Sequence, residues 1–146
     1  MAVIRRNPGS VSAADDAFRR RAIAEVNAAC GEVRARFVTQ IPGQEMVYQR
    51  KEEEAGRYLA AALPLLADFP FIAAEVGITG ATPRDVAQLY RDMAAQWRQI
   101  GAGLETVRLG AVVGIEKAAD AAAVVARLAQ FRADLAAFVA ALPDAG

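Results

Sequence analysis

The side chains best suited to acid–base or metal chemistry in this sequence are glutamates. Glu52, Glu53 and Glu54 are consecutive, and Glu75 follows further along the chain. Two carboxylates that share an apolar pocket can act as a general acid and base, or bind a cation. Consecutive residues of a helix point in different directions, however, and no feature of the sequence brings two of these carboxylates together. We therefore expect a solvated face here, and we predict no catalytic and no metal-binding residues.

Histidine is absent, and Cys30 is the single cysteine. Histidine is the side chain best matched to proton transfer near neutral pH and the commonest metal ligand. One cysteine excludes an intrachain disulfide and a thiolate metal cluster. Cys30 lies at helical spacing from Val26, Val33 and Phe37, so we expect a small core residue; a thiol nucleophile would also need an activating base. The sequence thus predicts a protein that is not an enzyme and has no cofactor.

Closely spaced glycines could suggest a phosphate-binding loop. Gly101 and Gly103 form one pair, and Gly110 and Gly114 form another. A phosphate loop follows a strand and opens a helix, and the P-loop ends in Gly-Lys-Ser/Thr. Neither context is present, so we expect these glycines to allow close approach of a neighbouring helix. We predict no small-molecule substrate.

The charge balance argues against binding to nucleic acid, and the short apolar runs argue against a membrane span. The 17 basic residues match the 17 acidic ones, and the run Arg19–Arg21 is expected to be a solvated helix face beside Asp15 and Asp16. The longest apolar run, 109–115, is too short to span a bilayer, for which about 20 residues are needed. Residues 1–10 lack an apolar signal region. We expect no nucleic-acid partner, no membrane span and synthesis in the cytoplasm.

The composition favours slender helices. Hydrophobic residues make up 55% of the chain but aromatic residues only 7%, and alanine, the best helix former, is abundant. We predict an all-α protein with a flexible or partner-bound tail over residues 1–11 and a single helical domain over residues 12–146. The expected helices cover about 12–40, 44–62, 71–76, 83–118 and 120–142.

Several turn and cap residues set these limits. Ser12 and Asp120 are candidate N-caps, and Thr82-Pro83-Arg84-Asp85 is the clearest helix start, with threonine at the cap and proline first in the helix. Pro42-Gly43 should end the first helix, and Gly77 suits a left-handed C-cap position. Residues 65–69 are predicted to form a connector with apolar anchors.

Apolar residues in the last two helices recur with a seven-residue period, in steps of four and three. The later helix carries Val124, Leu128, Phe131, Leu135, Phe138 and Leu142. We predict an elongated helical bundle with a long C-terminal antiparallel hairpin, although a break near Gly101–Gly103 is an open alternative. The longer helix supplies the expected interface for other copies of the chain: Val86, Tyr90, Met93, Trp97, Ile100, Leu104, Val107, Gly110 and Gly114.

Three stretches carry a family resemblance: residues 36–48 (RFVTQIPGQEMVY), 69–80 (FPFIAAEVGITG) and 94–101 (AAQWRQIG). In this order they resemble small alanine-rich proteins encoded among phage and prophage tail genes of proteobacteria, over about residues 36–118. The resemblance implies a virion-associated structural or assembly role near the tail or tail fibre. The implied partners are other copies of the chain and other particle or tail proteins, and the implied location is a phage or phage-like particle.

Two other functions fit the same residues. A chaperone that holds a tail or fibre protein would be absent from the mature particle. A host-directed helical binding module would be free in the bacterial cytoplasm together with a host partner.

Overall fold

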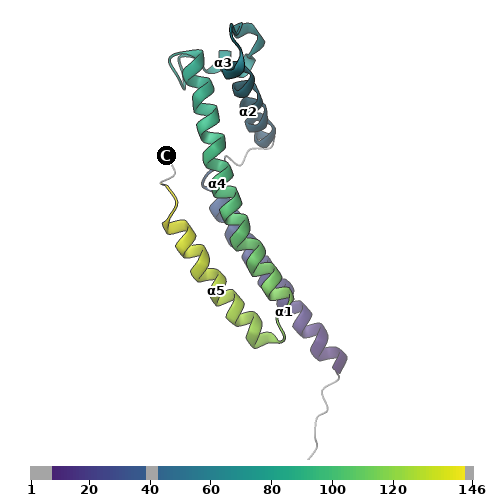
Figure 1. Ribbon diagram of the computed structural model, residues 1–146. Coiled ribbons are helices and arrows are strands. Elements are labelled where there is room, and N and C mark those ends of the chain that lie inside the picture. Colours follow the sequence, from purple (N-terminus) through teal and green to yellow (C-terminus); the bar gives the residue numbers. More distant parts are fainter. Residues whose placement is uncertain (1–7, 39–42, 144–146) are drawn as a thin grey trace, which may run out of the picture. The chain divides into compact units, whose positions relative to one another are not determined.

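The computed structural model describes residues 8–38 and 43–143 of the chain. Within these ranges the protein forms five α-helices, one 3-10 helix and no strand (Figure 1). The elements are α1 (Pro8–Ala35), α2 (Gln44–Ala60), η1 (Leu66–Asp68), α3 (Pro70–Glu75), α4 (Pro83–Glu116) and α5 (Ala121–Ala140). The all-α class predicted from the sequence is correct. None of these helices is long and apolar enough to cross a bilayer.

Helix α1 begins and ends earlier than predicted. It starts at Pro8, so Ser12 lies inside the helix instead of capping it, and residues 8–11 are helical instead of part of a tail. Proline suits a first turn because the N–H that it lacks has no partner there in any case. The helix stops at Ala35 and closes with a tight turn in which Phe37 N–H donates to Arg34 O at 3.1 Å. The predicted tail residues 1–7 and the predicted stop at Pro42 lie outside the described residues.

Contacts between residues divide the chain into two compact units. The single helical domain over residues 12–146 stays a prediction. Unit 1 consists of Met1–Phe37 and Gly101–Gly146, and unit 2 consists of Val38–Ile100. Helix α4 belongs to both units, because the boundary falls between Ile100 and Gly101. Each unit has its own apolar cluster.

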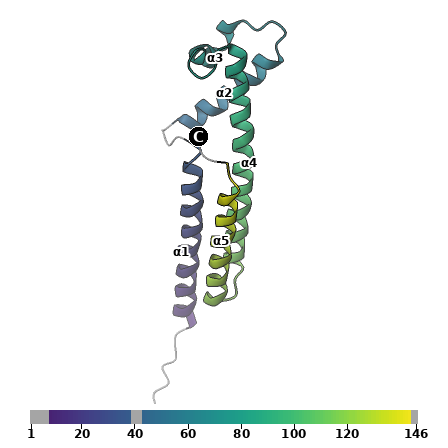
Figure 2. The same cartoon turned by 90° about the vertical axis from the view of Figure 1, so that its left-hand side faces the viewer.

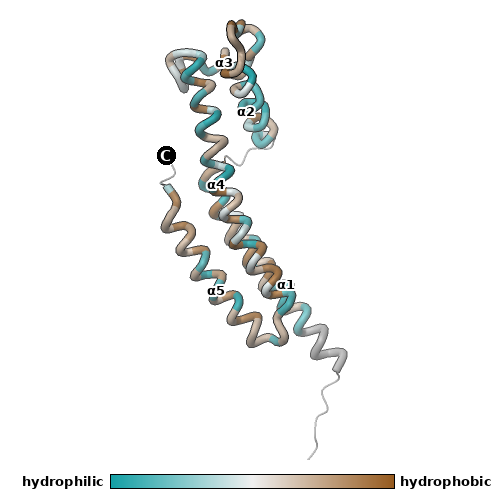
Figure 3. The backbone as a smooth tube through the Cα atoms, viewed as in Figure 1, coloured by the Kyte–Doolittle hydropathy of each residue, from teal (hydrophilic) through white to brown (hydrophobic). Residues whose placement is uncertain are grey.

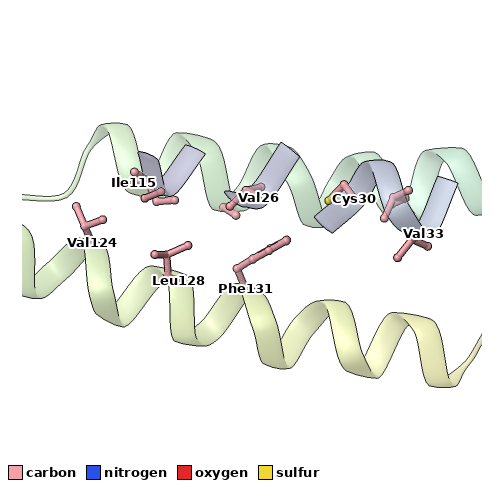
Figure 4. Packing of buried hydrophobic residues seen from close by; sticks show 10 residues of the cluster. Val26, Cys30, Val33, Ile115, Val124, Leu128 and Phe131 are labelled. Atoms are coloured by element: carbon pink, nitrogen blue, oxygen red, sulfur yellow. The ribbon is translucent and has the colours of Figure 1, made fainter. Parts of the chain in front are cut away.

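In unit 1, α1, the second half of α4 and α5 lie side by side (Figures 1 and 2). Hydrophobic residues recur along each of these helices (Figure 3), and their buried side chains meet between them (Figure 4). Burial of apolar surface at this seam is the main stabilising contribution in the unit. The buried cluster comprises Ala22, Val26, Cys30, Val33, Leu104, Ala111, Ile115, Val124, Leu128 and Phe131.

Two of the four glycines in α4 allow the close helix contact that the sequence predicted. A Cβ atom on Gly103 would lie 2.5 Å from Cε2 of Phe138, and one on Gly114 would lie 3.2 Å from Cδ of Arg127. Both partners are on α5. The prediction is wrong for Gly101 and Gly110, where a Cβ atom would meet no atom within 4 Å.

In unit 2, α2, α3 and the first half of α4 enclose a smaller cluster. Its buried members are Ala55, Phe69, Ile72, Val86, Ala87 and Tyr90. The ring of Tyr58 meets that of Phe69 edge-on, with 5.1 Å between the centroids. The segment between α2 and α3 therefore holds one apolar anchor, Phe69, whereas the predicted anchors Leu65 and Leu66 are exposed.

Capping interactions fix the helix starts near the unit 2 turn and before α5. Thr82 and Asp85 form a reciprocal box, in which Asp85 N–H donates to Thr82 Oγ1 at 3.1 Å and Thr82 N–H donates to Asp85 Oδ2 at 3.0 Å. Asp120 accepts a 2.8 Å hydrogen bond from Ala123 N–H. Gly77 adopts φ 83°, the left-handed conformation that a glycine tolerates at a helix end.

Candidate functional site

Most of the predicted interface stripe on α4 is covered within the chain. Val86 and Tyr90 belong to the unit 2 cluster, and Leu104 and Val107 contribute to that of unit 1. Val86 and Leu104 are fully buried, so their positions are explained by packing inside the chain without a second copy. Gly114 also faces another part of the chain, because it lies against Arg127.

The remaining stripe residues have different surroundings. Met93 is 52% exposed, Gly110 is exposed and Trp97 is half-buried, whereas Ile100 is buried. Met93 is therefore the large apolar member of the stripe that a partner can reach. The interface with other copies of the chain stays a prediction. Within the stripe, Met93 and Gly110 are exposed and Trp97 is half-buried.

The glutamates that could do acid–base chemistry each have a different partner. Glu52 pairs with Arg98, Glu53 accepts a 3.0 Å hydrogen bond from Arg50, and Glu54 accepts one from the Ile72 N–H. Within the described part of the chain, no group of three or more carboxylate, cysteine or histidine side chains could hold a metal ion. The run thus serves three separate structural contacts.

Glu54 is the buried carboxylate of unit 2. It is 3% exposed, and its Oε2 accepts the Ile72 N–H at 2.9 Å. That N–H lies in the first turn of α3, where backbone donors have no partner within the helix. Glu54 therefore joins α2 to the start of α3, and its burial has a structural purpose.

A second polar group joins α2, α3 and α4. Lys51 of α2 forms an ion pair with Glu75, whose other oxygen accepts the Thr79 hydroxyl at 2.9 Å. Lys51 also lies over the ring of Tyr90, with 5.1 Å to the centroid, and the Tyr90 hydroxyl donates to Phe71 O at 3.0 Å. These contacts hold the end of α3 between its two neighbouring helices.

The titration of this group follows from its contacts. Burial opposes ionisation of Glu75, but hydrogen bonds from Lys51 and Thr79 outweigh it and lower the pKa of the carboxyl. Burial, and then the charge of Glu75, raise the pKa of Tyr90. Glu75 is thus held as an anion that pairs with Lys51, and Tyr90 is held as a neutral phenol beside them.

Cys30 lies in the unit 1 cluster, as the sequence predicted (Figure 4). Burial is the largest influence on its thiol and raises the pKa. A thiol held in its neutral form is a poor nucleophile.

The arginine run Arg19–Arg21 is only partly a solvated face. Arg20 and Arg21 are exposed, but Arg19 donates to the carbonyl oxygens of Ile115 and Glu116 at 3.0 and 3.3 Å. These carbonyls belong to the last turn of α4, where backbone acceptors have no partner within the helix. Arg19 thus caps α4 from α1, which the sequence spacing could not indicate.

The connector between α2 and α3 holds three exposed leucines, which we call the leucine segment: Leu63, Leu65 and Leu66. Leu63 is 91% exposed and Leu65 is 70% exposed. Ile78, in the turn between α3 and α4, is 79% exposed. Large contiguous patches of exposed apolar side chains typically mark surfaces that contact another protein.

Sequence reasoning missed the exposure of the leucine segment, and it took Leu65 and Leu66 for apolar anchors. The segment contains Pro64 and is bounded by Pro70, so it has no helical or strand period that would indicate which side chains face inwards. The only sequence signal for the exposure of these leucines was the absence of a helical or strand period in this connector.

Comparisons of the chain with protein family models, with curated proteins and with solved structures found no match.

Proposed function

We propose that this protein is a non-enzymatic structural or adaptor component of a phage or phage-like particle, associated with the tail or tail fibre. It acts by contact with other particle proteins and by helix-mediated self-association. The resemblance of residues 36–48, 69–80 and 94–101 to small alanine-rich proteins encoded among phage and prophage tail genes supports the proposed location. The elongated bundle and the long antiparallel hairpin of residues 83–118 and 120–142 belong to the same proposal.

The observation that carries the adaptor role is the leucine segment. Leu63 and Leu65 expose most of their surface, although each would favour burial by about 1.5–3 kcal/mol. Phe69 anchors the connector in the unit 2 core, and Leu63 and Leu65 are not part of that core. A partner can therefore contact these leucines without disturbing the packing of unit 2. A partner that covers them recovers this free energy, which favours a binding role for the segment.

The hairpin is supported by the order of the contacts between α4 and α5. Gly103 lies beside Phe138, and Gly114, further along α4, lies beside Arg127, which is earlier in α5. Residue numbers that rise on one helix while they fall on the other are typical of antiparallel neighbours. Only a short link, residues 117–120, separates the two helices.

Mass spectrometry of purified particles tests the location. The chain should copurify with tail proteins through a density gradient, in a fixed ratio to them. Its absence from particles of a strain that produces it would refute the structural role. Presence in assembly intermediates alone would support the chaperone alternative.

Substitution within the leucine segment tests the contact surface. Leu63→Asp combined with Leu65→Asp should reduce incorporation into particles at least tenfold, because two charges replace exposed apolar contacts. The matched control is Ala67→Asp, which adds a charge to the same exposed connector and removes little apolar surface. Circular dichroism should show all variants folded, since none of these side chains belongs to a core cluster. Equal incorporation of the double variant and the control would refute the role of the segment.

A further inference from the structure

Four exposed residues on the outer side of α4 in unit 1 have the spacing that accepts a side chain from a partner. Thr106, Leu109, Gly110 and Val113 follow one another at three, four and seven residues from the first. Four helix residues at this spacing form the hole of knobs-into-holes packing, and we call them the α4 hole. A Cβ atom on Gly110 would meet no atom within 4 Å, so the space above this glycine is open.

The α4 hole is apolar and uncharged. Leu109 is 46% exposed and Val113 is 40% exposed, and neither belongs to the unit 1 cluster. The Thr106 hydroxyl donates to a backbone carbonyl of its own helix at 3.0 Å, so its polar group already has a partner. Between residues 101 and 115 the charged side chains of α4 are Glu105 and Arg108, which form an ion pair with each other. The hole therefore favours an aliphatic side chain.

Packing within the described chain gives no reason for a glycine at position 110. Glycine weakens a helix interior relative to alanine, and no neighbouring element uses the space that Gly110 leaves. At Gly103 and Gly114, by contrast, side chains of α5 pack where a Cβ atom would lie. A side chain from another molecule that enters the α4 hole would give Gly110 the same purpose.

The chain itself carries suitable side chains in the leucine segment. Leu63 is 91% exposed and Leu65 is 70% exposed, and residues 58–67 carry no charge, which matches the uncharged hole. Asp68 follows the segment and Lys117 follows the helix that carries the hole. Both are exposed, and neither forms an ion pair within the described ranges. These opposite charges make the two surfaces complementary.

We propose that copies of this protein associate head to tail, with the leucine segment of one copy against the α4 hole of the next. Because the two surfaces differ, each pair keeps one free segment and one free hole, so the contact repeats into rings or chains. This inference rests on the self-association in the proposed function and names the surfaces for it. Its tests use the purified chain, so absence of the chain from particles would leave their result unchanged.

Analytical ultracentrifugation of two defective variants tests the contact. The segment variant carries Leu63→Asp with Leu65→Asp, and the hole variant carries Val113→Glu. The parent should assemble as its concentration rises, and each variant alone should associate at least about tenfold more weakly. An equimolar mixture should form a heterodimer and nothing larger, because the intact segment of the hole variant fits the intact hole of the segment variant.

The matched control is Ala126→Glu, which adds the same charge to an exposed position of α5 outside the α4 hole. This control should associate as the parent does. Circular dichroism should show every variant folded, since none of the substituted residues belongs to a core cluster. A parent that stays monomeric at all concentrations would overturn the proposal, and so would a mixture of the two variants without a heterodimer.

Cross-linking identifies the two surfaces without removing them. One chain carries Leu65→Cys and the other Thr106→Cys, with Cys30→Ala in both so that only the new thiols react. A short bis-maleimide reagent should join the two chains. Replacing Thr106→Cys by Ala126→Cys, at an exposed position away from the hole, should lower the yield at least about tenfold. Equal yields from the two pairs would contradict the head-to-tail contact.

Discussion

Replacing Glu54 with alanine should destabilise unit 2 by about 2–3 kcal/mol, because the Ile72 N–H loses its acceptor in a buried position. The Glu54 carboxylate is 3% exposed and accepts this N–H at 2.9 Å. A hydrogen bond to a charged group contributes about 1.5–3 kcal/mol, and a buried donor left without a partner costs a similar amount of free energy. Glu54→Gln keeps an acceptor oxygen at the same distance along the side chain, and should cost less than about 1 kcal/mol.

The glutamate run supplies its own control. Glu53 is a neighbour of Glu54 in sequence, but its side chain is exposed and pairs with Arg50, which is exposed as well. Exposed ion pairs three or four residues apart on a helix contribute about 0.3–0.5 kcal/mol, so Glu53→Ala should change the free energy of unfolding by no more than this. The two alanine variants differ in environment and not in chemistry.

Trp97 is a convenient probe for this comparison. It is the single tryptophan of the chain and belongs to unit 2, so its fluorescence during urea or thermal unfolding reports on that unit. For a unit of this size, 2 kcal/mol corresponds to a fall in Tm on the order of 10 °C. If Glu54→Ala and Glu53→Ala unfold within about 0.5 kcal/mol of each other, the structural role of the buried carboxylate is wrong.

Three further measurements test other contacts. The contacts of Glu75 lower the pKa of its carboxyl below the ordinary 4.5. The stability that Glu75 contributes should therefore be present above pH 4.5 and be lost as the pH falls through the pKa of the folded state. Glu75→Gln should flatten this loss of stability at acid pH, measured by Trp fluorescence. Gly103→Ala should cost about 1–3 kcal/mol in thermal unfolding because its Cβ atom would overlap the Phe138 ring, whereas Gly110→Ala should be neutral or stabilising. Cys30 should react with a thiol reagent only as fast as unit 1 opens, so equal rates for the native and the urea-unfolded protein would contradict its burial.

The parts of the fold that local chemistry determines could be predicted from the sequence. Pro83 begins α4 as expected, and the Thr82–Asp85 and Asp120 caps form the predicted hydrogen bonds. These features involve residues within one turn of each other, so spacing alone is informative. The start of α1 was missed because serine is a favoured N-cap residue, so Ser12 was taken for the cap. Pro8, as a residue favoured in the first turn of a helix, could have indicated the true start.

Features that depend on distant residues could not be predicted. The seven-residue period of α4 correctly marked an apolar stripe, but it could not indicate that Val86 and Leu104 pack in two different clusters, or that Met93 stays exposed. Similarly, the sequence gives Arg19 no visible partner, since the carbonyls it caps are almost a hundred residues away. In the candidate site, no sequence period indicates that Leu63 and Leu65 are exposed while Phe69 is buried.

The sequence order of the two units has a consequence for synthesis on the ribosome. Unit 2 is continuous in sequence, whereas unit 1 is interrupted by it, so α1 emerges long before α5 can cover Val26 and Val33. At about 5–20 residues per second, the apolar side of α1 waits on the order of 5–20 s for Leu128 and Phe131. A ribosome-bound chain stalled after α4 should thus expose that side to proteases and to apolar dyes. Release of the C-terminal helix should end this exposure in one cooperative step.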